Sequence, residues 1–180
     1  MNRKRLALSD PERLKRVEGE SKGFTLIELL VVIIILGVLA ALVTGNFFTS
    51  LKKGRDAKRK ADLEQITRAL EMYYEDKRIY PVTANLTFGS PLCETSVCAG
   101  TEKVYMQKVP NDPILGKSYQ YLSSDGTDYK LFSCLENNLQ ILPYVSSGYS
   151  YTSANCGNCK NQAGTDVLCV WGVSSSNISP

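Results

Sequence analysis

A continuous run of apolar side chains near the amino terminus limits what this chain can fold into more than any other feature. The stretch LLVVIIILGVLAALV, residues 29–43, has no polar side chain, and no charged side chain occurs from Leu29 to Leu51. At 1.5 Å per residue, a helix over this charge-free stretch is about 35 Å long and can cross the ~30 Å hydrocarbon core of a bilayer. The segment is therefore predicted to be a transmembrane helix rather than a buried helix of a soluble domain.

A secretory signal peptide is the main alternative for this segment. Such a signal has a shorter apolar region that is followed by a cleavage site of small residues. Here the apolar run continues directly into a charged segment, so we expect it to be retained in the mature protein. Seven Lys or Arg precede the span and six follow it within residues 52–60, so the positive-inside rule does not orient it. All six cysteines follow the span, which places that side in an oxidising, extracytoplasmic compartment.

The composition limits the function classes that the chain can serve. Its 180 residues suit one compact domain with appendages. Residues 1–23 have a net charge of +3 and residues 24–180 a net charge of zero, so nucleic acid is not expected as the main partner. The absence of histidine excludes histidine-based catalytic triads, two-histidine zinc sites and haem ligation by histidine.

The apolar helix is predicted to continue as an amphipathic helix over residues 52–77. Small and apolar side chains recur there at spacings of three and four, the period of one helix face. These residues are Ala57, Ala61, Ile66, Ala69, Leu70, Tyr73 and Tyr74. Because Pro81 disfavours helix at Tyr80, one helix of roughly fifty residues is expected to end near residues 76–79. We expect the basic run at 52–60 to be a solvated face, with contact to lipid headgroups as the alternative.

Residues 79–180 are predicted to form a small domain on which the helix lays its apolar face. The segments 118–123 and 128–135 flank the turn-rich residues 124–127 and are predicted to form a β-hairpin. Residues 167–173 are predicted to form a third, buried strand, and residues 145–163 to be mostly loop. The expected fold class is α+β, with one long N-terminal helix packed on a small antiparallel sheet.

The six cysteines are predicted to form structural disulfides that tie down a loop-rich C-terminal region. Cys93 and Cys98 form the most plausible local bridge, and a strand cysteine, Cys134 or Cys169, is expected to bond to the loop with Cys156 and Cys159. One alternative is a zinc site of Cys134, Cys156, Cys159 and Cys169, which would need reduced thiols. The other is a redox-active pair, Cys156 and Cys159, although no helix N-terminus is evident there to lower a thiol pKa.

The segment KGFTLIELLVVIIILGVLAAL, residues 22–42, resembles the leader junction and N-terminal helix of type IV pilins and pseudopilins. The resemblance extends through RDAKRKADLEQITRALEMYYEDKRIYP and is closest to the major pseudopilin of type II secretion systems. It implies a pilin-like fold in which residues 1–23 are a leader. A prepilin peptidase would cleave after Gly23 and methylate the new N-terminal residue, Phe24.

The acidic residue at the edge of the apolar run, Glu28, has two interpretations. From the physics of helices alone, a carboxylate at the start of a helix interacts favourably with the helix dipole. The resemblance implies a role in filament assembly, in which Glu28 neutralises the Phe24 amine of a neighbouring subunit. Each of these charges alone is costly to bury, whereas the pair is tolerable and fixes the register of the two helices.

The resemblance also implies how the chain is organised and what it does. Residues 24–51 would be the transmembrane and filament-core half of the helix, 52–78 its amphipathic half and 79–180 an extracytoplasmic domain. The chain would be a structural subunit, not an enzyme, anchored once in the cytoplasmic membrane and then drawn into a filament in the periplasm or at the cell surface. Its expected partners are further copies of itself, minor pseudopilins, the prepilin peptidase, an assembly ATPase and an inner-membrane platform.

Two other functions and one ligand stay open at this point. An adhesive or DNA-uptake pilus subunit would be similar in structure, and a membrane-tethered thiol oxidoreductase would use Cys156 and Cys159. No cofactor is expected, although some members of the resembled group bind calcium. The acidic residues considered for calcium, without assignment as ligands, are Asp112, Asp125, Asp128 and Asp166.

Overall fold

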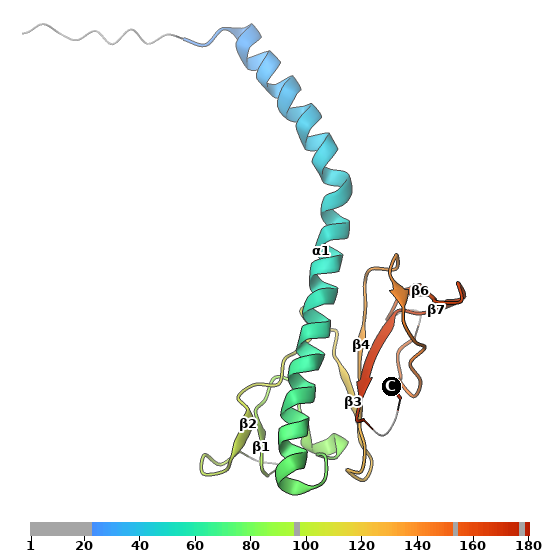
Figure 1. The fold of residues 1–180 in the computed structure, drawn as a ribbon. Coiled ribbons are helices and arrows are strands. Elements are labelled where there is room, and N and C mark those ends of the chain that lie inside the picture. The colour runs from blue at the N-terminus through green and yellow to red at the C-terminus, as the bar shows by residue number, and fades with distance from the viewer. Residues whose placement is uncertain (1–22, 96–97, 153–154, 177–178) are drawn as a thin grey trace, which may run out of the picture. The chain divides into compact units, whose positions relative to one another are not determined.

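The computed structural model describes residues 23–95, 98–152, 155–176 and 179–180, so the predicted leader lies outside the described residues except for Gly23 (Figure 1). The chain divides into two compact units, Met1–Val43 and Thr44–Pro180. One helix of 52 residues, α1 (Leu26–Lys77), belongs to both units and confirms the predicted long helix and its end. It ends where Arg78 adopts a left-handed conformation (φ 59°) and donates its N–H to the Tyr74 carbonyl at 2.7 Å.

The buried face of α1 differs from the prediction at its start. Ile66, Ala69, Leu70 and Tyr73 are buried as expected. Ala57 and Ala61 are exposed, and the buried positions in that part of the helix are charged. The charged residues that take their place are Asp56, Arg59 and Asp62. The first turns of the amphipathic half therefore contact the domain through ionic groups.

A three-stranded antiparallel sheet packs against α1 and contains the predicted hairpin. Its strand order is β3 (Gln120–Leu122), β4 (Lys130–Cys134) and β8 (Val170–Ser174), with Tyr121 opposite Leu131 and Phe132 opposite Gly172. The hairpin turn contains Gly126 at φ 80°, where an added Cβ would lie 2.7 Å from the Tyr80 carbonyl oxygen. Glycine is therefore required by both the backbone conformation and the close approach of the chain.

Two smaller sheets complete the domain. The strands β1 (Leu92–Cys93) and β2 (Val104–Met106) form an antiparallel pair that follows a short 3-10 helix, η1 (Thr83–Asn85). The other sheet has the order β5 (Ile141–Leu142), β6 (Asn158–Asn161) and β7 (Asp166–Leu168), with β5 parallel to β6 and β6 antiparallel to β7. The strand β6 lies within residues 145–163, which were predicted to be mostly loop.

The single strand predicted over 167–173 is wrong, because the chain forms two strands in different sheets there. Cys169 separates β7 from β8. Its N–H donates to the Gly157 carbonyl at 2.8 Å, and its carbonyl accepts the Leu135 N–H at 2.7 Å. The first bond continues the antiparallel register of β6 and β7, and the second continues that of β4 and β8, so the chain passes from one sheet to the other at Cys169.

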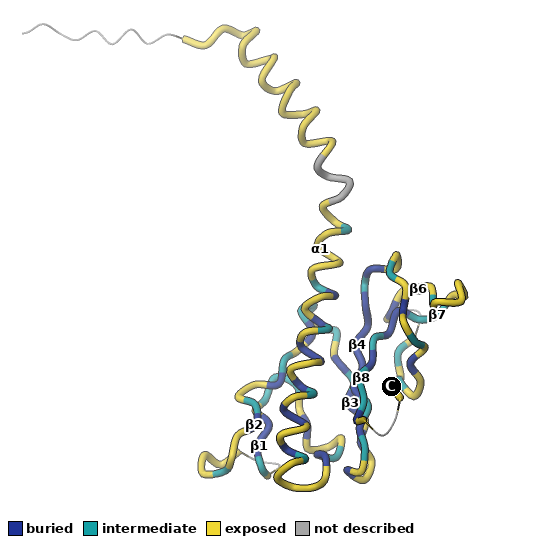
Figure 2. Tube along the Cα trace, viewed as in Figure 1, coloured by how far each residue is buried: buried dark blue, intermediate teal, exposed yellow. Residues whose placement is uncertain are grey.

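Tyrosines make up much of the core between α1 and the strands. Figure 2 shows buried residues on strands β3, β4 and β8, in contrast to the exposed N-terminal part of α1. Four of the buried tyrosines donate hydrogen bonds from their phenols, which compensates for the burial of these polar groups. The bonds run from Tyr80 to Glu71 (3.1 Å), Tyr105 to Asp76 (2.9 Å), Tyr119 to Asp62 (2.8 Å) and Tyr121 to the Pro81 carbonyl (2.6 Å).

The six cysteines form three disulfides within the domain: Cys93–Cys98, Cys134–Cys156 and Cys159–Cys169. The first confirms the predicted local bridge. The other two show that both strand cysteines, not one of them, are bonded to the loop region with Cys156 and Cys159. The disulfide-tied C-terminal region is therefore confirmed.

Candidate functional site

The N-terminal end of α1 is closed by a capping box that involves the predicted assembly residue, Glu28. The Thr25 N–H and the Thr25 hydroxyl donate to Glu28 Oε2 at 2.8 and 2.7 Å. In return, the Glu28 N–H donates to Thr25 Oγ1 at 3.3 Å. A Thr at the cap and a Glu three residues later satisfy each other's donors in this way. The structure therefore shows Glu28 capping the start of the helix, with its carboxylate exposed beside Phe24.

The apolar side chains that follow this cap have no covering in the single chain. Phe24 is 89% exposed, and Glu28 lies with it, Ile27, Val31 and Val32 along one open groove. The large apolar residues from Leu26 to Leu42 are between 46% and 89% exposed. An apolar surface of this extent is far larger than soluble monomers leave in water. The helix must therefore be solvated by lipid or by other apolar chains.

Among the described residues, no single helix is long and apolar enough to cross a membrane by itself. The segments Leu26–Leu42 and Phe47–Lys77 meet that requirement in length and composition only when they are taken together.

A buried cationic centre holds the amphipathic half of α1 to the domain. Arg59 is fully buried, and its Nε and Nη2 donate to the two carboxylate oxygens of Asp112 at 2.7 and 2.9 Å. Its Nη1 donates to Asp56 at 2.8 Å and to Glu136 at 2.6 Å. Arg55 also donates to Glu136, at 2.6 Å from Nη2. Each of the Arg59 nitrogens thus donates to a carboxylate, as a buried cation requires, and Arg55 supplies a second positive charge against the three carboxylates.

Backbone donors complete this arrangement, which we call the Arg59 network (Arg55, Asp56, Arg59, Asp112 and Glu136). The N–H groups of Glu136 and Asn137 donate to the Asp56 carboxylate at 2.9 and 2.8 Å. The loop that follows β4 is therefore fixed to the helix by both its backbone and its side chain. The prediction that the basic run at 52–60 is a solvated face is wrong for Arg55 and Arg59. It is also wrong for Lys60, whose ammonium lies 4.4 Å from the centre of the Trp171 ring.

The charges of the Arg59 network stabilise one another. Hydrogen bonds from Arg55 and, to a smaller extent, Arg59 lower the pKa of Glu136 from its ordinary value of 4.5 to about 2. Burial lowers the pKa of Arg59, but hydrogen bonds to Asp112 and Glu136 outweigh it and raise that pKa. Because the folded-state pKa of Glu136 is depressed, its contribution to stability is present above pH 4.5 and is lost as the pH falls towards 2.

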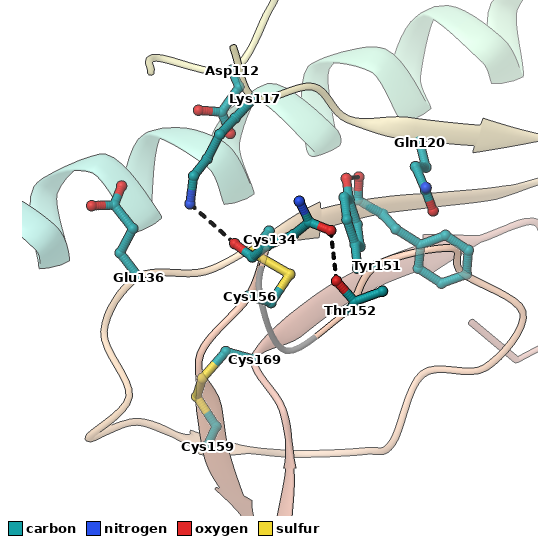
Figure 3. The surroundings of a disulfide bond; sticks show 12 residues. Asp112, Lys117, Gln120, Cys134, Glu136, Tyr151, Thr152, Cys156, Cys159 and Cys169 are labelled. Carbon is teal, nitrogen blue, oxygen red and sulfur yellow. Dashed lines mark hydrogen bonds between the residues drawn. A yellow bond between two sulfur atoms is a disulfide. The ribbon is translucent and has the colours of Figure 1, made fainter. Parts of the chain in front are cut away.

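The disulfides decide between the interpretations of the cysteines. Figure 3 shows Cys156 bonded to Cys134 and Cys159 bonded to Cys169. Cys156 and Cys159 thus do not form the bond that a redox-active CxxC pair uses. The same bonds consume all four thiols of the alternative zinc site, so both alternatives are wrong for this structure.

Three of the four aspartates considered for calcium have other partners. Asp112 belongs to the Arg59 network, Asp125 accepts bonds from Thr127, and Asp166 forms an ion pair with Lys160 at 2.8 Å. Within residues that the structure describes, no three side chains of Cys, Asp or Glu are arranged to hold a metal ion.

Two consecutive segments of the chain match known protein families. Residues 20–44 match the prokaryotic N-terminal methylation motif, and residues 46–140 match the family model described as type II secretion system (T2SS), protein G. Neither of these matches extends past residue 140. No solved structure matches the chain.

Several curated relatives have the same printed name, type II secretion system core protein G. That of Klebsiella pneumoniae is 39% identical over 105 residues, which are 57% of this chain and 74% of that protein. The Pseudomonas aeruginosa protein is 36% identical over 107 residues, 58% of this chain and 75% of that protein. The protein of Pectobacterium carotovorum subsp. carotovorum is 35% identical over 141 residues, which are 76% of this chain and 83% of that protein.

Proposed function

Since the chain belongs to the type II secretion system protein G family, we propose that it is a pseudopilin cleaved after Gly23 and methylated on Phe24. The observation that carries this proposal is the exposed apolar part of α1, with Phe24 just before the helix and the capped Glu28 in its first turn. A chain of this family is a structural subunit, so no catalytic residue is assigned. The leader motif supports anchoring in the membrane before assembly.

In this function the exposed helix packs in two different environments, the membrane and the filament. In the membrane its apolar side chains contact lipid, and in the filament the same side chains contact neighbouring helices. Leucine gains little by exchanging lipid for protein, so close packing and pairing of charges have to favour assembly. Because the surfaces joined at successive levels differ, the assembly stays open and grows as a fibre.

Glu28 would supply the pairing of charges. Its capping bonds hold the carboxylate at the first turn of α1, beside its own Phe24. A neighbouring subunit shifted by about one helical turn would bring its methylated Phe24 amine to that carboxylate. The pair would neutralise both charges within the apolar core of the filament.

The family favours a secretion pseudopilus over an adhesive or DNA-uptake pilus. Residues 79–180 contain five basic and seven acidic side chains, so they offer no excess of positive charge for nucleic acid. The partners that we propose are further copies of the chain, minor pseudopilins, the prepilin peptidase, an assembly ATPase and an inner-membrane platform. The filament would lie in the periplasm or at the cell surface.

Overproduction in a bacterium that has a type II secretion system tests this function. We expect electron microscopy with a labelled antibody to show fibres of the chain in cells with an active prepilin peptidase. Cells without the peptidase should hold the same amount of chain in the membrane and no fibres. Membrane-bound monomers in both strains would contradict the proposal.

A further inference from the structure

The end of the globular domain at which α1 enters it combines positive charge with exposed aliphatic side chains. We call this surface the proximal rim: Lys52, Lys53 and Lys58 of α1, Leu139 of the loop after β4, and Ile141 of β5. All five residues are exposed, Leu139 to 76% and Ile141 to 67%. In Figure 1, β6 and β7 lie at this end of the domain, whereas β1 and β2 lie beside the C-terminal end of α1.

The proximal rim is positive because the acidic groups beside it are enclosed. Asp56 and Asp112 are buried, and Glu136 is 12% exposed; all three face Arg59. In the part of the chain that the structure describes, the three rim lysines form no ion pair. The carboxylates of the Arg59 network are thus enclosed and bonded to arginines, whereas the charges of the rim lysines are exposed to solvent.

The position of the rim along α1 matches the headgroup layer of a bilayer. The charge-free part of the helix ends at Leu51. Asp56, which binds the backbone of the loop after β4, lies five residues further along, or about 7.5 Å at 1.5 Å per residue. The headgroup region on each side of a bilayer is roughly 5–8 Å thick. A helix that leaves the hydrocarbon core near Leu51 therefore brings Leu139 to the level of the headgroups.

We propose that the proximal rim docks on the surface of an anionic bilayer and holds the globular domain against the membrane before assembly. This inference rests on the proposed membrane anchoring of α1. Lysines that surround apolar side chains next to a membrane segment bind anionic headgroups, while the apolar side chains enter the interface. A second copy of the chain fits less well, because the rim carries charge of one sign and continues directly from the lipid-facing part of the helix.

Quenching of tryptophan fluorescence by lipids brominated near the headgroup tests the proposal. The full-length chain, reconstituted in vesicles of phosphatidylcholine and phosphatidylglycerol, would contain either Leu139→Trp or the matched control Ile79→Trp. Ile79 is 50% exposed and lies just beyond the other end of α1. The signal of Trp171 in the parent chain is subtracted from both.

We expect quenching at position 139 to be at least about twofold stronger than at position 79 in the anionic vesicles at low salt. Because salt screens exposed charges, raised NaCl should remove most of this difference without any further change to the protein. The difference in quenching should also disappear in vesicles of phosphatidylcholine alone. It should disappear likewise when the rim lysines are replaced together, by Lys52→Glu, Lys53→Glu and Lys58→Glu.

Flotation of the vesicles separates the inference from the proposed function on which it rests. A chain that does not float with vesicles of either composition would contradict membrane anchoring itself. A chain that floats but shows equal quenching at positions 139 and 79, or quenching independent of lipid charge, would overturn the docking proposal alone. If the tryptophan at position 139 is protected from quenching only at a high protein-to-lipid ratio, a second copy of the chain covers the rim. That result would also overturn the docking proposal.

Discussion

Replacing Glu28 by alanine should reduce the number of filaments at least about tenfold, while membrane insertion and cleavage after Gly23 continue. The Phe24 amine of each subunit would then enter the apolar core of the filament without a counter-charge. An unpaired buried charge costs several kcal/mol, and each 1.4 kcal/mol changes an equilibrium tenfold. Electron microscopy of cells that overproduce the variant, with immunoblots of the membrane fraction for the amount of processed chain, gives the measurement.

Two matched variants separate the charge of Glu28 from its role in the capping box. Glu28→Gln retains an oxygen that can accept the Thr25 bonds but removes the charge, so it should fail to assemble as Glu28→Ala does. Thr25→Ala removes the cap, at a cost of about 0.5–2 kcal/mol of helix stability, but retains the charge and should still form filaments. Normal filament numbers from Glu28→Gln would refute the pairing of Phe24 and Glu28.

Replacing Arg59 by leucine should lower the free energy of unfolding of the globular domain by about 3–5 kcal/mol. The change leaves Asp56, Asp112 and Glu136 close together at the buried contact without the cation that they surround. The loop after β4 and the loop that carries Asp112 would both lose a contact to α1. Denaturant unfolding of the full chain in detergent, followed by tyrosine and tryptophan fluorescence, measures the loss.

A matched control distinguishes the buried network from a general effect of removing an arginine. Arg68 is an exposed arginine on the same helix, so Arg68→Leu should change the free energy of unfolding by no more than about 0.5 kcal/mol. Arg59→Lys retains the charge without the two parallel bonds to Asp112, and should fall between the two. Equal stabilities of Arg59→Leu and Arg68→Leu would show that the network does not stabilise the domain.

The parts of the fold that were predictable depend on neighbours in the sequence. The long apolar run and Pro81 set the length and the end of α1, and the turn residues around Gly126 specify the hairpin of β3 and β4. The disulfide Cys93–Cys98 joins cysteines that are five residues apart, which made it the most plausible local bridge. Each of these features has a cause within a short stretch of chain.

The features that were missed depend on residues far apart in the sequence. Arg59 bonds to Asp112 across 53 residues and to Glu136 across 77, so a run of like charges on α1 gave no sign of its buried partners. The spacing of Ala57 and Ala61 fitted the apolar face, but the two loops present carboxylates to this part of the helix. Likewise, the change of sheet at Cys169 depends on its backbone bonds to Gly157 on one side and Leu135 on the other, which local strand propensity does not contain.

The mass of the chain in purified filaments tests most directly whether α1 passes from the membrane into an assembly after processing. The account predicts a chain that lacks residues 1–23 and begins with a methylated Phe24, isolated from cells that have an active prepilin peptidase. A chain that still begins with Met1 in those cells, and that remains monomeric in the membrane, would contradict the account.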